Sequence, residues 1–350
     1  MSKKEKYKIS TLNIAVMSLC LISIFFFVFA NIILDNRKSI DVYSQSSQAE
    51  SSNLDQQNPP TVSDTPTVSD RNIPKKENLV AQIPPKRNEF KPQPPYAPHF
   101  SKSDIEKINQ VVKSYDEPKN SISVYYEDLY SKNVYSYNTQ QKYFIASIIK
   151  APYCMYLYQL ASEAKLDLNE KLLLEPKHIK PGTGKLKEID AETLPKEFSI
   201  KELISYSILH SDNSAMDLLL DFYPHSGYQK YANSIGITNP KDVKYVVNGD
   251  ICATDAAIYA KALYHFIETN PYGLELKKDM LETINPMIVS KNPVARKYGW
   301  GEKSFHDMAI VYAKNPYVLV ILSDHEAGTQ KDYQMFSEIT RILEKTQPKL

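Results

Sequence analysis

The spacing of apolar and polar positions divides the chain into three parts. Residues 12–34 contain no charged side chain, residues 36–99 are mainly polar, and regular apolar spacing starts near Ser101. A period of 3.6 residues predicts helices, whereas strict alternation predicts strands. Helical spacing follows a capping box at residues 103–106 and recurs at residues 147–164, 199–222, 226–235, 254–268 and 331–344.

Strand-like segments lie on both sides of the helical block. They are residues 121–126 and 133–137 before it, and residues 294–299, 307–313 and 317–324 after it. Strands that are split by a helical insertion predict an α+β fold, in which one antiparallel sheet is flanked by its terminal helices beside a mostly helical lobe. We expect a functional site in a cleft between the sheet and this lobe.

The N-terminal apolar run is long enough to cross a bilayer as a helix. Residues 12–34 lack charge, and residues 1–11 contain four lysines, which favours a cytoplasmic N-terminus. We therefore predict a transmembrane signal-anchor helix at residues 12–34, with the rest of the chain outside the cell membrane. A signal peptide that is cleaved after Val28-Phe29-Ala30 is the alternative.

Residues 35–100 are predicted to be a disordered, Pro/Ser-rich tether to a folded domain at residues 101–350. Ten of the 22 prolines lie between Pro59 and Pro98, whereas all 9 glycines lie at Gly182 or beyond. Such a polar segment cannot bury enough apolar surface to offset its chain entropy. We interpret it as a spacer without a specific partner.

Charge and cysteine content exclude several kinds of partner. The formal net charge of +1 gives no electrostatic basis for nucleic-acid binding. Cys154 and Cys252 are the two cysteines of the folded part, and we favour buried free thiols over a bridge because no disulfide framework is visible. No histidine or cysteine spacing predicts a metal site, and no cofactor is expected. The pair His306-Asp307 is interpreted as a structural hydrogen bond.

Three short polar motifs lie in the folded part. They are Ser147–Lys150 (Ser-Ile-Ile-Lys), Ser211–Asn213 (Ser-Asp-Asn) and Lys297–Gly299 (Lys-Tyr-Gly). A serine and a lysine one helical turn apart place an amine within reach of a hydroxyl. A lysine whose pKa is lowered by burial can take the proton of such a serine. Each motif is weak by itself, since an N-cap serine followed by a surface lysine is common.

Taken together, the motifs resemble those of class A β-lactamases and low-molecular-weight penicillin-binding proteins. That family has Ser-x-x-Lys, then Ser-Asp-Asn, then Lys-Thr-Gly or Lys-Ser-Gly on a late strand. Here Ser147 and Ser211 are 64 positions apart, and Lys297 follows 86 positions later. The resemblance covers residues 115–348 and implies a β-lactamase/transpeptidase-like fold that forms a serine acyl-enzyme.

The resemblance implies a catalytic role for three matched residues. Ser147 would attack an amide carbonyl, Lys150 would help to remove its proton, and Ser211 would relay a proton to the leaving nitrogen. Asp212 is interpreted as structural support for its turn. The substrate-binding positions that the resemblance implies are Asn213, Lys297, Tyr298, Gly299 and Trp300.

The resemblance also implies how these positions would bind a substrate. Asn213 would hold the amide side chain of the substrate and contact Lys150. Lys297 would supply positive charge for the substrate carboxylate and would help to keep Lys150 deprotonated. The backbone N–H groups of Ser147 and Trp300 would form an oxyanion hole, in which each donor contributes about 3–4 kcal/mol.

The sequence departs from the family pattern in two places. Tyr298 stands where the family has a small hydroxyl residue that binds the substrate carboxylate. No glutamate occurs in residues 214–253, although class A enzymes use one there to activate the deacylating water. Thr254 resembles the turn that follows this segment. Asp250 is a candidate substitute, but its shorter side chain must still reach the water.

We therefore predict an extracytoplasmic, membrane-anchored serine hydrolase of a Gram-positive bacterium. It would form an acyl-enzyme at Ser147 with a β-lactam or a peptidoglycan-like peptide, and it would deacylate slowly. Two alternatives stay open: a catalytically impaired binding protein at the cell surface that keeps the fold, and an esterase or peptidase with a reshaped pocket.

Overall fold

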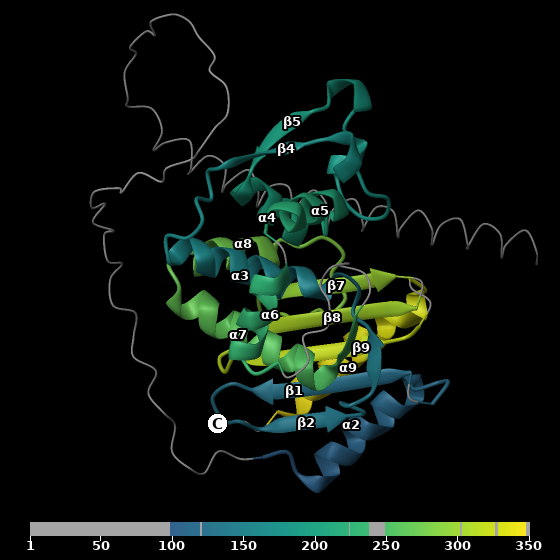
Figure 1. Ribbon diagram of the computed structural model, residues 1–350. Helices are drawn as coiled ribbons and strands as arrows, with labels where there is room; N and C mark the ends of the chain where they lie inside the picture. The colour runs from purple at the N-terminus through teal and green to yellow at the C-terminus, as the bar shows by residue number, and fades with distance from the viewer. Residues whose placement is uncertain are drawn as a thin grey trace, which may run out of the picture. The chain divides into compact units, whose positions relative to one another are not determined.

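The computed structural model describes residues 99–119, 121–223, 225–237, 249–301, 303–325 and 328–347 (Figure 1). The predicted anchor helix at residues 12–34, and the predicted tether up to residue 98, lie outside the described residues. Among the helices of the described part, none has the length and apolar character needed to cross a membrane.

The centre of the fold is a five-stranded antiparallel sheet with the strand order β2-β1-β9-β8-β7. Its strands are β1 (Ile122–Asp128), β2 (Val134–Tyr137), β7 (Val294–Gly301), β8 (Ser304–Val311) and β9 (Tyr317–Ser323). The sheet therefore joins strands from both sides of the helical block, as predicted. Strand β7 is the last in the order, so one of its edges carries no sheet partner.

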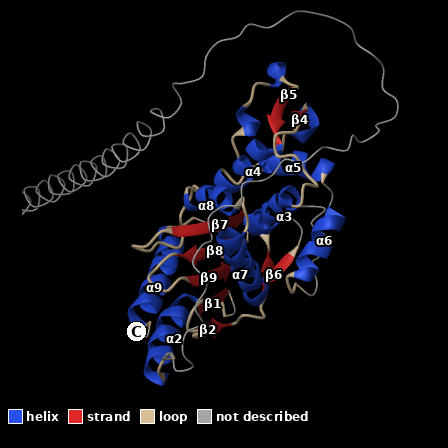
Figure 2. Cartoon of the chain, turned by 90° about the vertical axis from the view of Figure 1, so that its left-hand side faces the viewer, coloured by secondary structure: helices blue, strands red, loops and turns tan. Residues whose placement is uncertain are grey.

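The two terminal helices cover one face of this sheet. They are α2 (Lys102–Tyr115) and α9 (Gln330–Thr346), and Figure 2 shows them side by side against the strands. Their apolar positions, among them Ile108, Phe336 and Ile339, share one core with that face of the sheet. The cap of α2 differs from the prediction: Ser101, not Ser103, accepts the hydrogen bond from the Asp104 N–H.

The helical lobe lies on the other face of the sheet (Figures 1 and 2). Its helices are α3 (Lys150–Ser162), α4 (Ile200–Leu209), α5 (Asn213–Phe222), α6 (His225–Ser234), α7 (Ala253–Thr269) and α8 (Gly273–Leu281). The single helix predicted at residues 199–222 is two helices. The chain turns at Ser211, which has a positive φ of 52°, and Asp212 then caps α5.

Two small antiparallel sheets of the helical lobe were not predicted. One pairs β3 (Lys142–Phe144) with β6 (Asp250–Cys252), and the other pairs β4 (Lys171–Leu174) with β5 (Lys196–Ser199). Strands of three or four residues are too short for alternation to be recognised. The two cysteines agree with the prediction, because Cys154 and Cys252 are both buried free thiols.

Candidate active site

Ser147 lies in a short 3₁₀ turn, Ala146–Ile149, that leads directly into α3. The helix starts at Lys150, whose N–H donates to the carbonyls of Ser147 and Ile148. Ala146 has a positive φ of 46°, so the chain changes direction just before the serine. Ser147 is half-buried between the buried residues Ala146 and Ile148, which leaves its side chain partly open to solvent.

Strand β7 packs closely against this turn. A Cβ atom at Gly299 would lie 3.2 Å from the Ala146 Cβ atom and 3.3 Å from the Ile145 carbonyl oxygen. Only glycine avoids this crowding at Gly299. The third residue of the Lys-x-Gly motif therefore sets the distance between β7 and the serine turn.

His306 anchors the backbone that precedes the turn. Its Nε2 atom lies 2.8 Å from the Phe144 carbonyl oxygen, which also accepts from the Ser304 hydroxyl, and its Nδ1 atom accepts from the Ser323 N–H. This pattern assigns the neutral tautomer with the proton on Nε2. Burial lowers the pKa of His306 to about 4, so the ring stays neutral at physiological pH. The role of His306 is therefore structural, as predicted, but its partners are not Asp307, whose carboxylate accepts from the Ile288 N–H instead.

Lys150 is completely buried at the centre of the site. Its Nζ atom donates to the Asn213 Oδ1 atom at 2.7 Å and to the Ser211 carbonyl oxygen at 2.5 Å, and it lies 3.5 Å from the Ser211 hydroxyl. Burial lowers its pKa to about 7, against the opposing effect of the nearby Asp212 carboxylate. A neutral amine, which can accept a proton, is therefore well populated at physiological pH.

The turn between α4 and α5 brings Ser211 to both lysines of the site. The Ser211 hydroxyl accepts from the Lys297 Nζ atom at 2.9 Å, opposite its 3.5 Å approach to Lys150. The Ser211 carbonyl oxygen accepts a further bond from the Thr183 hydroxyl at 2.8 Å. The hydroxyl thus lies between two amines, where a proton can pass through it.

Asp212 supports the turn, in agreement with its structural interpretation. One of its carboxylate oxygens accepts from the Ser214 and Ala215 N–H groups at 2.9 and 3.0 Å. The other accepts from the Lys185 and Leu186 N–H groups at 2.5 and 2.8 Å. A single buried carboxylate therefore caps α5 and holds the preceding loop against it.

That loop, Pro181–Gly184, also positions Asn213. The Asn213 Nδ2 atom donates to the Pro181 carbonyl oxygen at 2.8 Å, and the Asn213 N–H donates to the Thr183 carbonyl oxygen. Gly182 and Gly184 have φ values of 94° and 131°, and a Cβ atom at either would collide with Asn213 or Asp212. The sequence predicted a loop here but no role in the site. The two glycines are its only signal.

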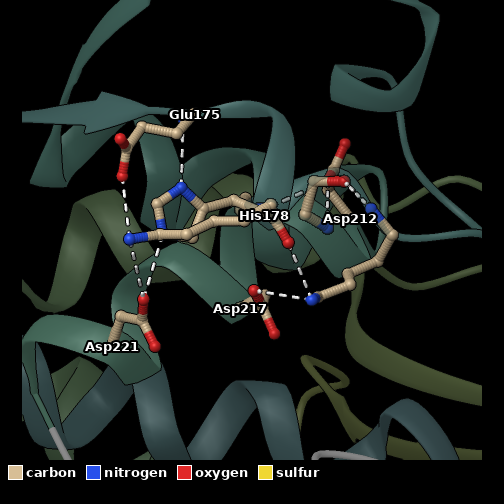
Figure 3. Close-up of polar contacts among 9 residues, drawn as sticks. Glu175, His178, Asp212, Asp217 and Asp221 are labelled. Atoms are coloured by element: carbon tan, nitrogen blue, oxygen red, sulfur yellow. Dashed lines mark hydrogen bonds and ion pairs between the residues drawn. The ribbon is translucent and has the colours of Figure 1, made fainter. Parts of the chain in front are cut away.

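A polar network holds the start of this loop segment on α5. His178 is buried and lies between the Glu175 N–H, 3.0 Å from its Nδ1 atom, and the Asp221 carboxylate, 3.0 Å from its Nε2 atom (Figure 3). Nearby, the Lys180 ammonium pairs with Asp217 at 3.2 Å. The segment that contacts the Ser211–Asn213 turn is therefore fixed to α5 at several points.

Lys297 is completely buried on β7, on the same face as Gly299. Its Nζ atom donates to the Ser211 hydroxyl at 2.9 Å and to the Tyr298 carbonyl oxygen at 3.0 Å. It also lies 4.0 Å from the centre of the Tyr298 ring. Burial, together with the positive charge of Lys150, lowers its pKa well below the usual lysine range.

Tyr298 and Trp300, which follow Lys297 on β7, differ in exposure. Tyr298 is 2% exposed and belongs to the core between the sheet and the terminal helices. Its hydroxyl interacts with Ser211. Trp300 is 43% exposed, with its indole edge-on to the Phe305 ring. The substrate-binding positions predicted on β7 are thus a buried lysine, a buried tyrosine, a tightly packed glycine and an open indole.

Asp250, the candidate deacylation residue, lies on a strand that pairs with the segment before the serine turn, but its side chain is exposed. Asp250 pairs with Phe144 across β6 and β3, and the neighbouring Gly249 carbonyl accepts from the Ile145 N–H at 2.7 Å. Thr254 contacts none of the predicted site residues through its hydroxyl, which donates to the Thr139 carbonyl oxygen and accepts from the Gln140 side-chain amide. Within the described ranges, His, Cys, Asp and Glu side chains form no group that could hold a metal ion.

Comparison with known proteins agrees with this geometry. Solved structures with similar folds include a β-lactamase from Sphaerobacter thermophilus (16% identity, TM-score 0.61, covering 69% of this chain and 97% of that one). They also include PBP-A (19%, TM-score 0.61, 71% and 97%) and the TLA-1 extended-spectrum β-lactamase (16%, TM-score 0.61, 70% and 100%). No curated protein sequence matches significantly. The model of the Beta-lactamase enzyme family matches residues 105–347, and the chain therefore belongs to this family.

Proposed function

We propose that this protein is a serine hydrolase that forms an acyl-enzyme at Ser147 with a β-lactam or a cell-wall-peptide amide. The observation that carries the proposal is the buried lysine next to the serine turn. Burial lowers the pKa of Lys150 to about 7, which gives the site a base at physiological pH. Family membership supports the same reaction class.

In the proposed reaction, the Ser147 Oγ atom attacks the substrate carbonyl carbon, and its proton passes to the neutral Lys150 amine. The new C–O bond gives a tetrahedral oxyanion, which the backbone N–H groups of Ser147 and Trp300 would stabilise. When the bond to the leaving nitrogen breaks, the nitrogen takes a proton from the Ser211 hydroxyl. Ser211 recovers a proton from Lys150, 3.5 Å away, so that the acyl-enzyme contains neutral groups again.

We propose that deacylation is slow. Residues 214–253 contain no glutamate, and Asp250, the candidate substitute, is exposed on β6. Without a base that activates water, hydrolysis of the ester must depend on Lys150 or on solvent. The protein would then keep its acyl group, as a penicillin-binding protein does.

The same proposal places the domain outside the cell membrane. Residues 12–34 would form the anchor, the lysines before them would stay in the cytoplasm, and residues 35–100 would separate the domain from the bilayer. Such a position would give the site access to cell-wall peptide. Protease treatment of intact cells tests it: the domain should be released, while a cytoplasmic domain would be protected.

Intact mass of the full chain, after incubation with benzylpenicillin, tests the acyl-enzyme. We expect an increase equal to the mass of the β-lactam, located on the peptide that contains Ser147, and no increase in Ser147→Ala. Persistence of the adduct after removal of free penicillin would support slow deacylation. An unchanged mass after long incubation at millimolar penicillin would contradict the proposed function.

A further inference from the structure

The hydrogen-bond donors of the Lys297 side chain are already used by other groups of the protein. An ammonium has three donors. Two of them reach the Ser211 hydroxyl at 2.9 Å and the Tyr298 carbonyl oxygen at 3.0 Å, and the third side of the group faces the Tyr298 ring at 4.0 Å. The side chain is 0% exposed. A substrate carboxylate would have to displace one of these contacts in order to bind Lys297.

The Tyr298 ring lies against the ammonium of Lys297 on β7, the last strand of the sheet. Successive side chains of a strand point to opposite faces, yet the ring of Tyr298 contacts the ammonium of its neighbour Lys297. Both side chains therefore bend around the edge of β7, which has no sheet partner. The ring cannot move away freely, because Tyr298 is 2% exposed and packs in the core that contains Phe305 and Phe336.

The lysines on the opposite side of the site do not offer a replacement. In the described loop that contacts the Ser211–Asn213 turn, Lys180 pairs with Asp217 and Lys185 pairs with Glu188. The Lys187 ammonium donates to the Gly182 carbonyl. An anionic group that enters between this loop and β7 would therefore lose water and meet, in this loop, cations that already have partners.

We propose that Tyr298 makes the site selective for acyl donors whose leaving group carries no negative charge, such as esters, or β-lactams and peptide amides with a neutral group in place of the carboxylate. This inference rests on the proposed acyl-enzyme at Ser147. The aromatic ring replaces a small hydroxyl at the position that, in the family, meets the substrate carboxylate. A neutral ester or carboxamide can lie against the ring without the desolvation penalty of a carboxylate.

Benzylpenicillin and its methyl ester form a matched pair for the test, because they differ only at this group, which is a carboxylate in one and an uncharged methyl ester in the other. The second-order rate of Ser147 acylation is measured by intact mass for each compound. We expect the methyl ester to react about 10-fold to 100-fold faster with the wild-type protein, the range that corresponds to one unpaired polar group. A faster reaction of the free acid would overturn the inference and leave the proposed function intact.

Two variants at the same position sharpen the test. Tyr298→Thr restores a small hydroxyl and should reverse the preference in favour of the free acid, whereas Tyr298→Phe keeps the ring and should keep the preference. A thermal melt checks that Tyr298→Thr, which empties a buried position, is folded; if it is not, the wild-type and Tyr298→Phe rates decide. If neither compound acylates Ser147, the proposed function and this inference both fail.

Discussion

The two ends of the candidate site differ in how far they keep the family's chemistry. At one end, Lys150 directly follows the serine turn and donates hydrogen bonds to the Ser211–Asn213 turn, and burial lowers its pKa to about 7. At the other end, Tyr298 closes the edge of β7 over Lys297. Under the proposed function, acylation and substrate recognition are carried by separate parts, and the second can change while the first is kept.

The first way to test this comparison is to remove the base from the acylating end. Lys150→Arg replaces this titratable amine with a guanidinium that stays protonated and cannot accept a proton at physiological pH, because the arginine pKa is too high. We expect the acylation rate to fall about 10²-fold to 10⁴-fold, the usual contribution of a general base.

The measurement is time-resolved intact mass with the methyl ester of benzylpenicillin. Lys177→Arg is a matched control, since Lys177 is exposed and pairs with Glu175. Its rate should equal that of the wild-type protein. If Lys150→Arg acylates at the wild-type rate, Lys150 is not the base and the role assigned to this end is wrong.

A second change tests whether the acylating end depends on its buried support. Asp212→Ala removes the acceptor of four backbone N–H groups. We expect the free energy of unfolding to fall by about 2–4 kcal/mol, from a lost helix cap and unsatisfied buried donors. The rate of acylation should fall as well, because Asp212 fixes the turn that carries Ser211.

Urea denaturation measures this loss, and Asp221→Asn is the control. Asp221 also bonds a buried side chain, His178, but its own side chain is 55% exposed. An exposed pair contributes less than about 1 kcal/mol. Equal losses in the two variants would show that burial of Asp212 does not explain its importance.

The third prediction concerns the pH dependence of the acylation rate, where the expected change per pH unit is the smallest of the three effects. In the proposed reaction the neutral form of Lys150 is the base, and its pKa is about 7 because of burial. The acylation rate should therefore level off above this pH and fall about tenfold per unit below it. A stopped reaction series from pH 5 to pH 9 measures the profile. A rate that is constant from pH 5 to pH 7 would contradict a lysine base with this pKa.

Much of the fold could be predicted from periodicity. The segments of the five-stranded sheet, the terminal helices and most of the helical block were visible as regular apolar spacing, and the structure confirms one antiparallel sheet flanked by the terminal helices. Helix α8 was not predicted. The break between α4 and α5 was missed because helical apolar spacing continues on both sides of the short Ser211–Asn213 segment. The strands β3 to β6 were missed because they are too short to show a period.

The members of the candidate site could also be identified from the sequence, since three motifs in a fixed order select them. Lys150, Ser211, Asn213 and Lys297 are joined by hydrogen bonds in the structure, and Ser147 lies in the turn that leads directly into Lys150. The supporting residues could not be found in this way. Thr183 and His306 act through contacts with residues 28 and 162 positions away, and such pairs leave no local signal.

The sequence by itself determined which side chains could carry acylation, and it showed that a tyrosine replaces a small hydroxyl residue. Only the tertiary structure decided what these side chains do to one another. The pKa of a lysine depends on its burial and its neighbours, and the reach of a tyrosine depends on the strand edge that it covers. Residues distant in sequence set both the pKa of Lys150 and the position of the Tyr298 ring against Lys297. For that reason neither could be predicted before the fold was known.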